Sequence, residues 1–299
     1  MERRRLLALP WLGQARRRSP ERPLTPHDLG STPWSLRREA ENAMSDQVES
    51  ERVGAVTVVR LRRPEAHNAL APDMLAELLE LAQAAAVDPD ARAIVLIGGT
   101  RAFSTGEDLY RAAELDEESF RAQIGAFQRL ASVLRLAPKP TVAAVAGFAY
   151  GGGLEIAVNC DARVAATNAR FACPEVEWGL TLTNGSSVLL RRLIGDGWAR
   201  ELLLFGAVFD AETALRIGLV TRLVDVGQLE REAIGMAHLA AGFSPHAMRL
   251  TKRLLNDEYD SWESVLEAET GAVTAAFDSG DVKARLREFV ARKAGRRTP

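Results

Sequence analysis

A chain of 299 residues, 47% of them hydrophobic and 26% charged, can bury a sizeable core and has the composition of an ordinary globular protein. The formal net charge of −2 gives no electrostatic reason to expect nucleic acid or an anionic membrane as the main partner. No run of 18 or more apolar residues occurs, so the sequence predicts no membrane-spanning helix.

The first 43 residues differ in composition from the rest of the chain. They contain nine Arg, five Pro and five Asp or Glu, with little apolar periodicity. Such a segment cannot bury enough apolar surface to offset the entropy lost on ordering, so we expect residues 1–43 to be disordered. Three arginines before residues 6–9 resemble the start of a targeting signal, but Pro10 interrupts the apolar run and no A-x-A cleavage site follows.

From residue 53 onward, short β-rich runs alternate with helical runs, which predicts an α/β fold. In chain order we expect a strand over 56–61, an amphipathic helix over 73–83, a buried strand over 93–97, a helix over 117–136, a strand over 141–145, a helix from the glycines at 147–153 to about residue 160, and a strand over 161–165. Beyond residue 224 only helices are predicted, over 228–241, 246–256, 261–278 and 281–293.

Glycines and carboxylates occur together in three segments. Ala102-Phe-Ser-Thr-Gly-Glu-Asp-Leu109 follows a predicted strand, and Gly151-Gly-Gly-Leu-Glu155 opens a predicted helix, whose first N–H groups have no intrahelical partner and carry the positive end of the helix dipole. Phe171-Ala-Cys-Pro-Glu175 places a second glutamate 20 residues after Glu155. Backbone donors beside two carboxylates are the groups needed for acid–base chemistry next to a carbonyl.

Each segment alone has a plainer interpretation, because a Gly-Gly-Gly run is most often a flexible loop and a glutamate in an apolar stretch can pair with a buried arginine. Their order and spacing, together with Arg63-Pro-Glu-Ala-His-Asn-Ala-Leu70 and Lys139-Pro140 upstream of the glycines, argue against coincidence. From about residue 53 to about residue 293 the sequence resembles the crotonase (enoyl-CoA hydratase/isomerase) superfamily. Members of that superfamily polarise a coenzyme A thioester with two backbone amides.

The resemblance implies a crotonase-like spiral of strand-strand-helix turns over residues 44–226 and a C-terminal helical trimerisation region over 227–299. It implies a homotrimer or a dimer of trimers, an acyl-CoA thioester as substrate, and no metal or redox cofactor. The Glu-Gly pair usual in the tail of relatives is replaced here by Ala284-Arg285.

The resemblance also implies roles for individual residues. The backbone N–H groups of Glu107 and Gly152 would form the oxyanion hole, Glu155 would be the base that activates water at the β-carbon, and Glu175 would be the acid that protonates the α-carbon. Glu107 departs from the family, in which small or apolar residues are commoner at this position. Its side chain is therefore expected to point away from the developing oxyanion.

Further positions follow from the same resemblance. The coenzyme A moiety is expected to lie against Ala102, Ser104, Gly106, Asp108, Leu109, Arg292 and Lys293. The acyl pocket is expected to include Cys173, Thr183, Asn184 and Ser186. Residues 179–187 depart from the Pro-Gly-x-Gly-Gly-Thr-like turn of typical hydratases, and their polar side chains would suit a substrate that carries a polar or ring group.

Other reactive residue types have plainer roles. Cys160 and Cys173 lack metal-ligand spacing, which favours a reducing, cytoplasmic location. Glu177 lies two residues after Glu175 and has no implied role, and Asp108 is better suited to fixing its loop by hydrogen bonds than to reacting.

We expect a lyase of the enoyl-CoA hydratase type, acting in fatty acid metabolism, that converts an enoyl-CoA to the 3-hydroxyacyl-CoA. Alternatives are an isomerase, another enolate-stabilising relative such as a hydratase-lyase of a specialised pathway, and a catalytically silent scaffold with the same fold. Retention of both glutamates and Gly152 argues against the scaffold.

Overall fold

The computed structural model describes residues 47–295, with side chains described as far as residue 291. The expectation of disorder over residues 1–43 lies outside this range, as do the side chains of Arg292 and Lys293. None of the helices within the described range is long and apolar enough to cross a membrane.

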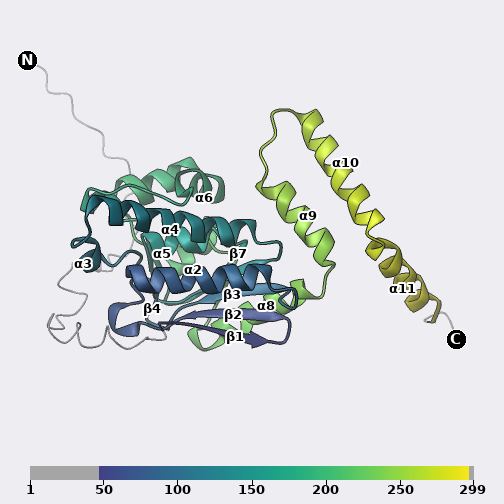
Figure 1. Cartoon of the computed structure of the whole chain (residues 1–299), viewed down its shortest axis with the longest axis horizontal. Helices are drawn as coiled ribbons and strands as arrows, with labels where there is room; N and C mark the ends of the chain where they lie inside the picture. Colours follow the sequence, from purple (N-terminus) through teal and green to yellow (C-terminus); the bar gives the residue numbers. More distant parts are fainter. Residues whose placement is uncertain (1–46, 296–299) are drawn as a thin grey trace, which may run out of the picture.

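Strands and helices alternate along the chain as the sequence predicts (Figure 1). The strands are β1 (Val48–Val53), β2 (Val56–Leu61), β3 (Ala93–Ile97), β4 (Ala102–Ser104), β5 (Thr141–Val145), β6 (Phe148–Tyr150), β7 (Ala162–Ala166), β8 (Arg170–Ala172), β9 (Phe209–Asp210) and β10 (Arg222–Val224). The α-helices are α2 (Pro72–Val87), α3 (Leu109–Ala112), α4 (Glu117–Leu136), α5 (Gly152–Val158), α6 (Ser186–Leu204), α7 (Ala211–Arg216), α8 (Leu229–Ala241), α9 (Pro245–Asn256), α10 (Trp262–Asp278) and α11 (Asp281–Gly295).

Successive strand pairs build two sheets. The larger sheet has the order β1-β2-β3-β5-β7-β10, and the smaller has the order β4-β6-β8-β9. Each turn of the chain adds one strand to the larger sheet and the next strand to the smaller one, as in β3 and β4, then β5 and β6, then β7 and β8. A helix returns the chain after each pair, so the fold is the predicted α/β spiral of strand-strand-helix turns.

Both faces of the larger sheet are covered, which explains why its central strands read as continuous apolar runs. Val59 and Leu61 of β2 belong to one apolar cluster with side chains of α2 and α4, whereas Val56 and Val58 belong to a second cluster. Helix α8 contributes Leu229, Ala233 and Ala237, spaced four residues apart, to the second cluster. Although α8 falls within the predicted region 227–299, it therefore packs on the body of the protein.

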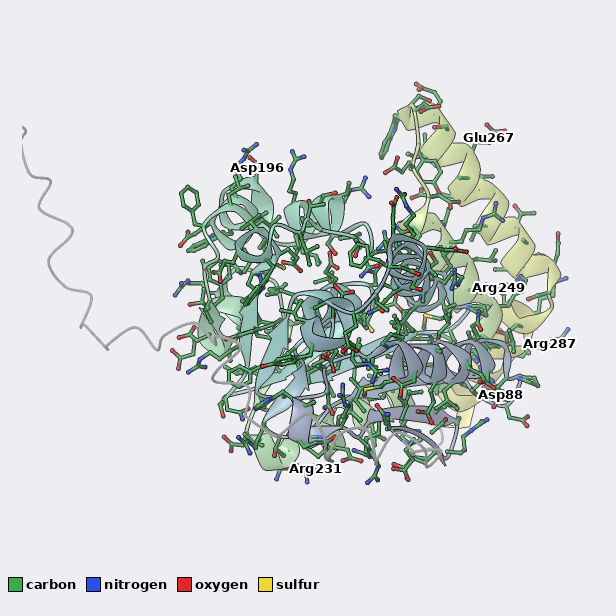
Figure 2. All side chains as sticks on the ribbon, turned by 60° about the vertical axis from the view of Figure 1, so that its left-hand side comes forward. Asp88, Asp196, Arg231, Arg249, Glu267 and Arg287 are labelled. Atoms are coloured by element: carbon green, nitrogen blue, oxygen red, sulfur yellow. The ribbon has the colours of Figure 1, made fainter. Side chains whose placement is uncertain are left out.

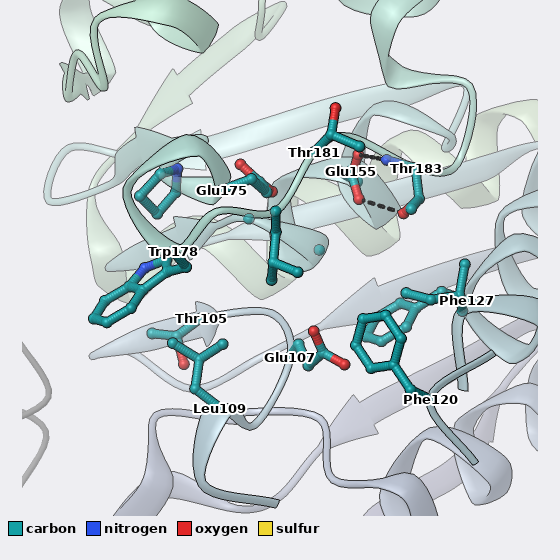
Figure 3. Close-up of a pocket in the computed structure, with 15 residues that line it drawn as sticks. Thr105, Glu107, Leu109, Phe120, Phe127, Glu155, Glu175, Trp178, Thr181 and Thr183 are labelled. Carbon is teal, nitrogen blue, oxygen red and sulfur yellow. Dashed lines mark hydrogen bonds between the residues drawn. The ribbon is translucent and has the colours of Figure 1, made fainter. Parts of the chain in front are cut away.

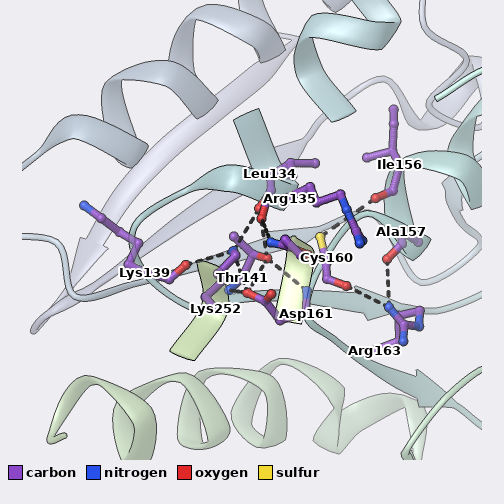
Figure 4. Close-up of polar contacts among 11 residues, drawn as sticks. Leu134, Arg135, Lys139, Thr141, Ile156, Ala157, Cys160, Asp161, Arg163 and Lys252 are labelled. Carbon is purple, nitrogen blue, oxygen red and sulfur yellow. Dashed lines mark hydrogen bonds and ion pairs between the residues drawn. The ribbon is translucent and has the colours of Figure 1, made fainter. Parts of the chain in front are cut away.

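Helices α9, α10 and α11 extend away from the body (Figure 1). One buried lysine ties α9 to it (Figure 4): Lys252 Nζ donates to Asp161 Oδ2 at 2.7 Å and to the carbonyl oxygens of Leu134 and Lys139 at 3.1 Å each. Thr141 completes the cluster by donating its N–H to Asp161 Oδ2 at 2.7 Å. The ammonium group of Lys252 thus donates all three of its hydrogen bonds to acceptors in the body of the protein.

Charged side chains are distributed over the outside of all layers (Figure 2). Asp196 on α6, Arg231 on α8 and Glu267 on α10 are all exposed. Helices α6 and α8 carry charges of both signs and the charged residues of α10 are all acidic, so none of the three presents a basic, polyanion-binding face.

Candidate active site

The two glycine-containing segments meet at one edge of the smaller sheet. Strands β4 and β6 are parallel neighbours, with Ala102 opposite Phe148 and Ser104 opposite Ala149. Because the carboxyl ends of parallel strands lie at the same edge, the residues that follow β4 and β6 emerge side by side. This places residues 105–107 against residues 151–153.

Their close approach depends on glycine. Gly106 has a φ of +84°, and a Cβ atom built on it would lie 2.6 Å from Gly152 N and 2.8 Å from Tyr150 O. A Cβ atom on Gly153 would lie 2.3 Å from Ser104 O. Only residues without side chains allow the two backbones to pack this tightly.

Backbone pairing with Leu70 directs the N–H of Glu107 toward the space that Gly152 also faces. In the bridge between Leu70 and Glu107, Leu70 N–H donates to Gly106 O at 2.7 Å and Asp108 N–H donates to Leu70 O at 3.2 Å. Since backbone groups alternate sides along an extended segment, the N–H of Glu107 faces away from Leu70. The N–H of Gly152 begins α5 and has no intrahelical acceptor. A carbonyl oxygen between these two donors would be polarised by both.

Glu107 and Gly152 line one cavity of about 290 Å³, together with Glu155 and Glu175 (Figure 3). Its apolar wall is formed by Leu109, Phe120, Ile124, Phe127, Trp178 and Leu180. A mostly apolar cavity with a few convergent polar groups is the usual form of a small-molecule site. The structure therefore brings the expected oxyanion donors and both expected catalytic carboxylates together.

The Glu155 carboxylate is held in place by three hydrogen bonds. Oε1 accepts from Thr183 N–H at 2.8 Å, while Oε2 accepts from Thr183 Oγ1 at 2.9 Å and from Asn184 Nδ2 at 3.1 Å. Burial raises the pKa of Glu155, and these donors act in the opposite direction because they stabilise the ionised form. The result is a fixed carboxylate, suited to accept a proton.

Glu175 has the opposite surroundings. It begins a short 3₁₀ turn, Glu175–Trp178, and neither carboxyl oxygen has a hydrogen-bond partner among the described residues. Burial, with a smaller contribution from the negative charge of Glu155, raises the pKa of Glu175 from 4.5 to about 7. Near neutral pH part of the population therefore carries a proton on Glu175 that it can donate.

Three expectations for the acyl pocket are corrected by the structure. Cys173, Asn184 and Ser186 are buried and do not line the cavity. Thr183 does line the cavity, but its hydroxyl and N–H both serve Glu155. Thr183 and Asn184 are therefore partnered by a carboxylate of the protein, whereas Thr181 also lines the cavity.

Several residues expected near coenzyme A are internal supports of the site. Ala102, Ser104 and Asp108 have buried side chains. Ser104 Oγ donates to Asn68 O at 2.8 Å and accepts from Gly106 N–H at 3.0 Å. Asp108 caps α3 through the N–H groups of Tyr110 and Arg111, and it accepts from Arg63 at 2.6 Å. Among the expected residues whose side chains the structure describes, Leu109 lines the cavity.

Arg63 and Asn68 are supports for which the sequence suggested no role. Asn68 Nδ2 donates to the carbonyl oxygens of Ala102 and Phe103, and its Oδ1 accepts from Arg63 N–H. Both residues lie in the Arg63–Leu70 motif, which the sequence identifies without indicating what these two side chains do. Its function is to hold the segment that carries the Glu107 donor.

The Glu107 side chain was expected to point away from the developing oxyanion. It lines the cavity and is turned toward α4, where Gln123 Nε2 donates to its Oε1 at 3.1 Å. Desolvation, with a further contribution from Asp108, raises the pKa of Glu107.

Comparisons with known proteins agree on one family. A family model described as enoyl-CoA hydratase/isomerase matches residues 37–296. A short-chain-enoyl-CoA hydratase of Clostridium acetobutylicum is 35% identical over 245 residues, which cover 81% of this chain and 94% of the relative. A crotonyl-CoA hydratase of Syntrophomonas wolfei is 34% identical over 241 residues, covering 80% and 92%.

Solved structures give the same result. An enoyl-CoA hydratase of Bacillus anthracis superposes with a TM-score of 0.79 at 30% identity, covering 82% of this chain and 96% of that structure. An enoyl-CoA hydratase of Thermoplasma volcanium superposes with a TM-score of 0.76 at 31% identity, covering 83% and 98%.

Proposed function

The chain belongs to the enoyl-CoA hydratase/isomerase family, and from this premise we propose how its cavity adds water to an enoyl thioester of coenzyme A. It is a hydratase-like enzyme, a hydro-lyase, by its similarity to hydratases over most of its length. The thioester oxygen accepts hydrogen bonds from the N–H groups of Glu107 and Gly152, which draws electron density from the double bond. The β-carbon thereby becomes electrophilic, and the enolate formed on attack is stabilised.

The two carboxyl groups divide the proton transfers. Glu155 takes a proton from water as the oxygen forms its bond to the β-carbon, and Glu175 gives its proton to the α-carbon of the resulting enolate. The product is the 3-hydroxyacyl thioester. Glu155 is then protonated and Glu175 ionised, and exchange with solvent restores both.

The observation that carries this proposal is the unequal environment of the two carboxyl groups. Glu155 has three hydrogen-bond donors, whereas Glu175 has none among the described residues and a pKa of about 7. A base and an acid that act together need this difference in protonation. An isomerase that only shuttles one proton would have no use for a second carboxylate fixed in this way.

The test is to incubate the purified protein with a panel of enoyl-CoA thioesters and to follow the products by mass. Hydration adds the mass of one water, isomerisation changes chromatographic position without changing mass, and a silent scaffold leaves the substrates unchanged. Isomerisation without water addition, or no reaction with any member of the panel, would contradict the proposal.

We further propose that the active enzyme is a homotrimer or a dimer of trimers that works in the cytoplasm in fatty acid metabolism. Two free, buried cysteines support a reducing compartment.

The steps above need only backbone donors and carboxyl groups, so we propose that no metal or redox cofactor takes part. Dialysis against EDTA should leave turnover unchanged.

A further inference from the structure

A third carboxyl group lies in the cavity and has no part in the two proton transfers. Glu107 lies across the cavity from Glu155 and Glu175, beside Phe120 and Phe127 of α4 (Figure 3). Its Oε1 is occupied by Gln123, which is only 4% exposed, whereas no described residue donates a hydrogen bond to Oε2. The carboxyl group is thus aimed by a buried partner and keeps one free acceptor atom.

The ionisable side chains that line the cavity, among the described residues, are all acidic. Among the described residues, those that line it include three glutamates and no Lys, Arg or His. An alkyl chain placed against Glu107 would remove water from an ionised or hydrogen-bonding carboxyl group without replacing the lost partner, which is costly. A carboxylate on the substrate would add like-charge repulsion.

We propose that Glu107 selects an acyl group that carries a hydroxyl or ammonium donor near its γ- or δ-carbon, and that it disfavours acyl groups that carry a carboxylate. The inference rests on the proposed hydration of enoyl-CoA thioesters. The position of the donor follows from the backbone: the N–H of Glu107 holds the thioester oxygen, so the side chain of the same residue reaches only the first carbons of the acyl chain. Phe120 and Phe127 enclose this part of the cavity.

A purely structural role for Glu107 makes a different prediction. If its bond to Gln123 served only to tie the loop to α4, replacing it would change stability and would affect all substrates alike. A role in selection changes the ratio between substrates. The ratio is therefore the deciding measurement.

The experiment compares four thioesters: crotonyl-CoA, 4-hydroxybut-2-enoyl-CoA, 5-aminopent-2-enoyl-CoA and glutaconyl-CoA. Values of kcat/KM for hydration are measured for wild type, Glu107→Gln and Glu107→Ala. Both substitutions keep the backbone N–H. Glu177→Ala is the matched control, since it removes an exposed carboxylate outside the cavity. Circular dichroism establishes that each variant is folded.

Wild type should prefer the two donor-bearing thioesters over crotonyl-CoA by about 10- to 100-fold, the value of one hydrogen bond to a charged group. Glu107→Ala should abolish this preference and improve glutaconyl-CoA relative to the others. Glu107→Gln should retain part of the hydroxyl preference and lose the ammonium preference, because an amide accepts hydrogen bonds without carrying charge. Glu177→Ala should keep the wild-type ratios.

Failure of the inference and failure of the proposed function are distinguishable. If wild type hydrates crotonyl-CoA as well as the donor-bearing thioesters and Glu107→Ala leaves all ratios unchanged, the inference is overturned while hydration stands. If wild type hydrates none of the four, the proposed function falls and the inference falls with it.

Discussion

Glu155 and Glu175 line the same cavity, yet one carboxylate is saturated with hydrogen bonds and the other has none among the described residues. The difference arises from the chain that follows them. The segment after the 3₁₀ turn, Glu175–Trp178, returns Thr183 and Asn184 to Glu155 but leaves Glu175 without a donor. Proton affinity at each position is therefore set by burial and by the hydrogen-bond donors that the tertiary fold brings to it.

Replacing either carboxylate by its amide should lower kcat for hydration by about 10²- to 10⁴-fold, the usual effect of losing a positioned acid or base. The variants are Glu155→Gln and Glu175→Gln, and steady-state kinetics are the measurement. Glu177→Gln serves as the control and should keep a kcat close to that of wild type, because Glu177 is exposed and does not line the cavity. If Glu155→Gln hydrates normally while Glu175→Gln is inactive, the two-carboxylate mechanism is wrong.

Glu175 should also reduce the stability of the fold at alkaline pH. Its pKa is raised from 4.5 to about 7 in the folded state, so the folded state binds more protons than the unfolded state between these values and stability falls as pH rises through them. Glutamine cannot ionise. Glu175→Gln should therefore unfold with a free energy about 1–3 kcal/mol above wild type at pH 8, and the gain should disappear by pH 4. Urea titrations at both pH values test this, and an equal gain at pH 4 would assign it to packing.

The N–H of Gly152 can be removed by one substitution and kept by a closely matched one. A Cβ atom at this position would lie 3.0 Å from Phe127 Cε1, so any substitution introduces the same contact. Gly152→Pro also removes the N–H, whereas Gly152→Ala keeps it. We expect kcat to be about 10²- to 10³-fold lower in the proline variant than in the alanine variant, with a smaller change in KM. Equal kcat values in two folded variants would remove this N–H from the mechanism.

At the scale of elements, the attachment of α9 depends on a few buried contacts. Its buried residue is Lys252, whose ammonium group is satisfied by Asp161 and by two carbonyl oxygens of the body. Helix α10 packs against α9 and α11, so the cluster around Lys252 helps to tie the C-terminal segment to the body.

Lys252→Met should lower the free energy of unfolding by about 3 kcal/mol, because it leaves the Asp161 carboxylate and two carbonyl groups without a cation. Arg253→Met is the matched control on the same helix. Arg253 pairs with Asp257 at an exposed position, so its loss should cost less than about 1 kcal/mol. Urea denaturation measures both, and equal effects would show that Lys252 contributes no more than a surface ion pair.

The strands over 56–61, 93–97 and 141–145 are confirmed at their predicted bounds, because apolar runs closed by proline or glycine are local signals. Helix α6 and the short strands β4, β6 and β8 were not predicted: α6 is interrupted at Gly195, which has a φ of +78°, and three-residue strands show no period.

The site shows the same limit. Motif spacing brought Glu107, Gly152, Glu155 and Glu175 together, but it could not show that Thr183 bonds to Glu155, 28 residues away. A polar side chain gives no sign in the sequence of whether its partner is a substrate or the protein itself. That information resides in the tertiary fold.

At the scale of the whole molecule, helix α10 of a single chain leaves its large apolar side chains exposed to solvent. None of its residues is buried, although Trp262, Val273 and Phe277 are large and apolar and are 69%, 67% and 47% exposed. An exposed apolar face of this kind marks an interface, which supports the proposed trimer.

Sedimentation equilibrium should therefore give a mass three or six times the 32.5 kDa of one chain. Phe277→Glu should weaken association by about tenfold or more, since a buried phenylalanine contributes about 1.5–3 kcal/mol. A monomeric wild-type protein, or a variant that associates as wild type does, would contradict this use of α10.

The oxyanion donors and the acyl wall belong to different parts of the fold. Glu107 and Gly152 follow neighbouring strands whose spacing is set by main-chain pairing, whereas Phe120, Ile124 and Trp178 come from α4 and the 3₁₀ turn. The two main-chain donors are therefore independent of the side chains at Phe120 and Ile124, whereas Trp178 shares its turn with Glu175. Substitutions at positions 120 and 124 can change the acyl group that fits while the main-chain donors that activate the thioester stay in place, so one scaffold can serve more than one substrate.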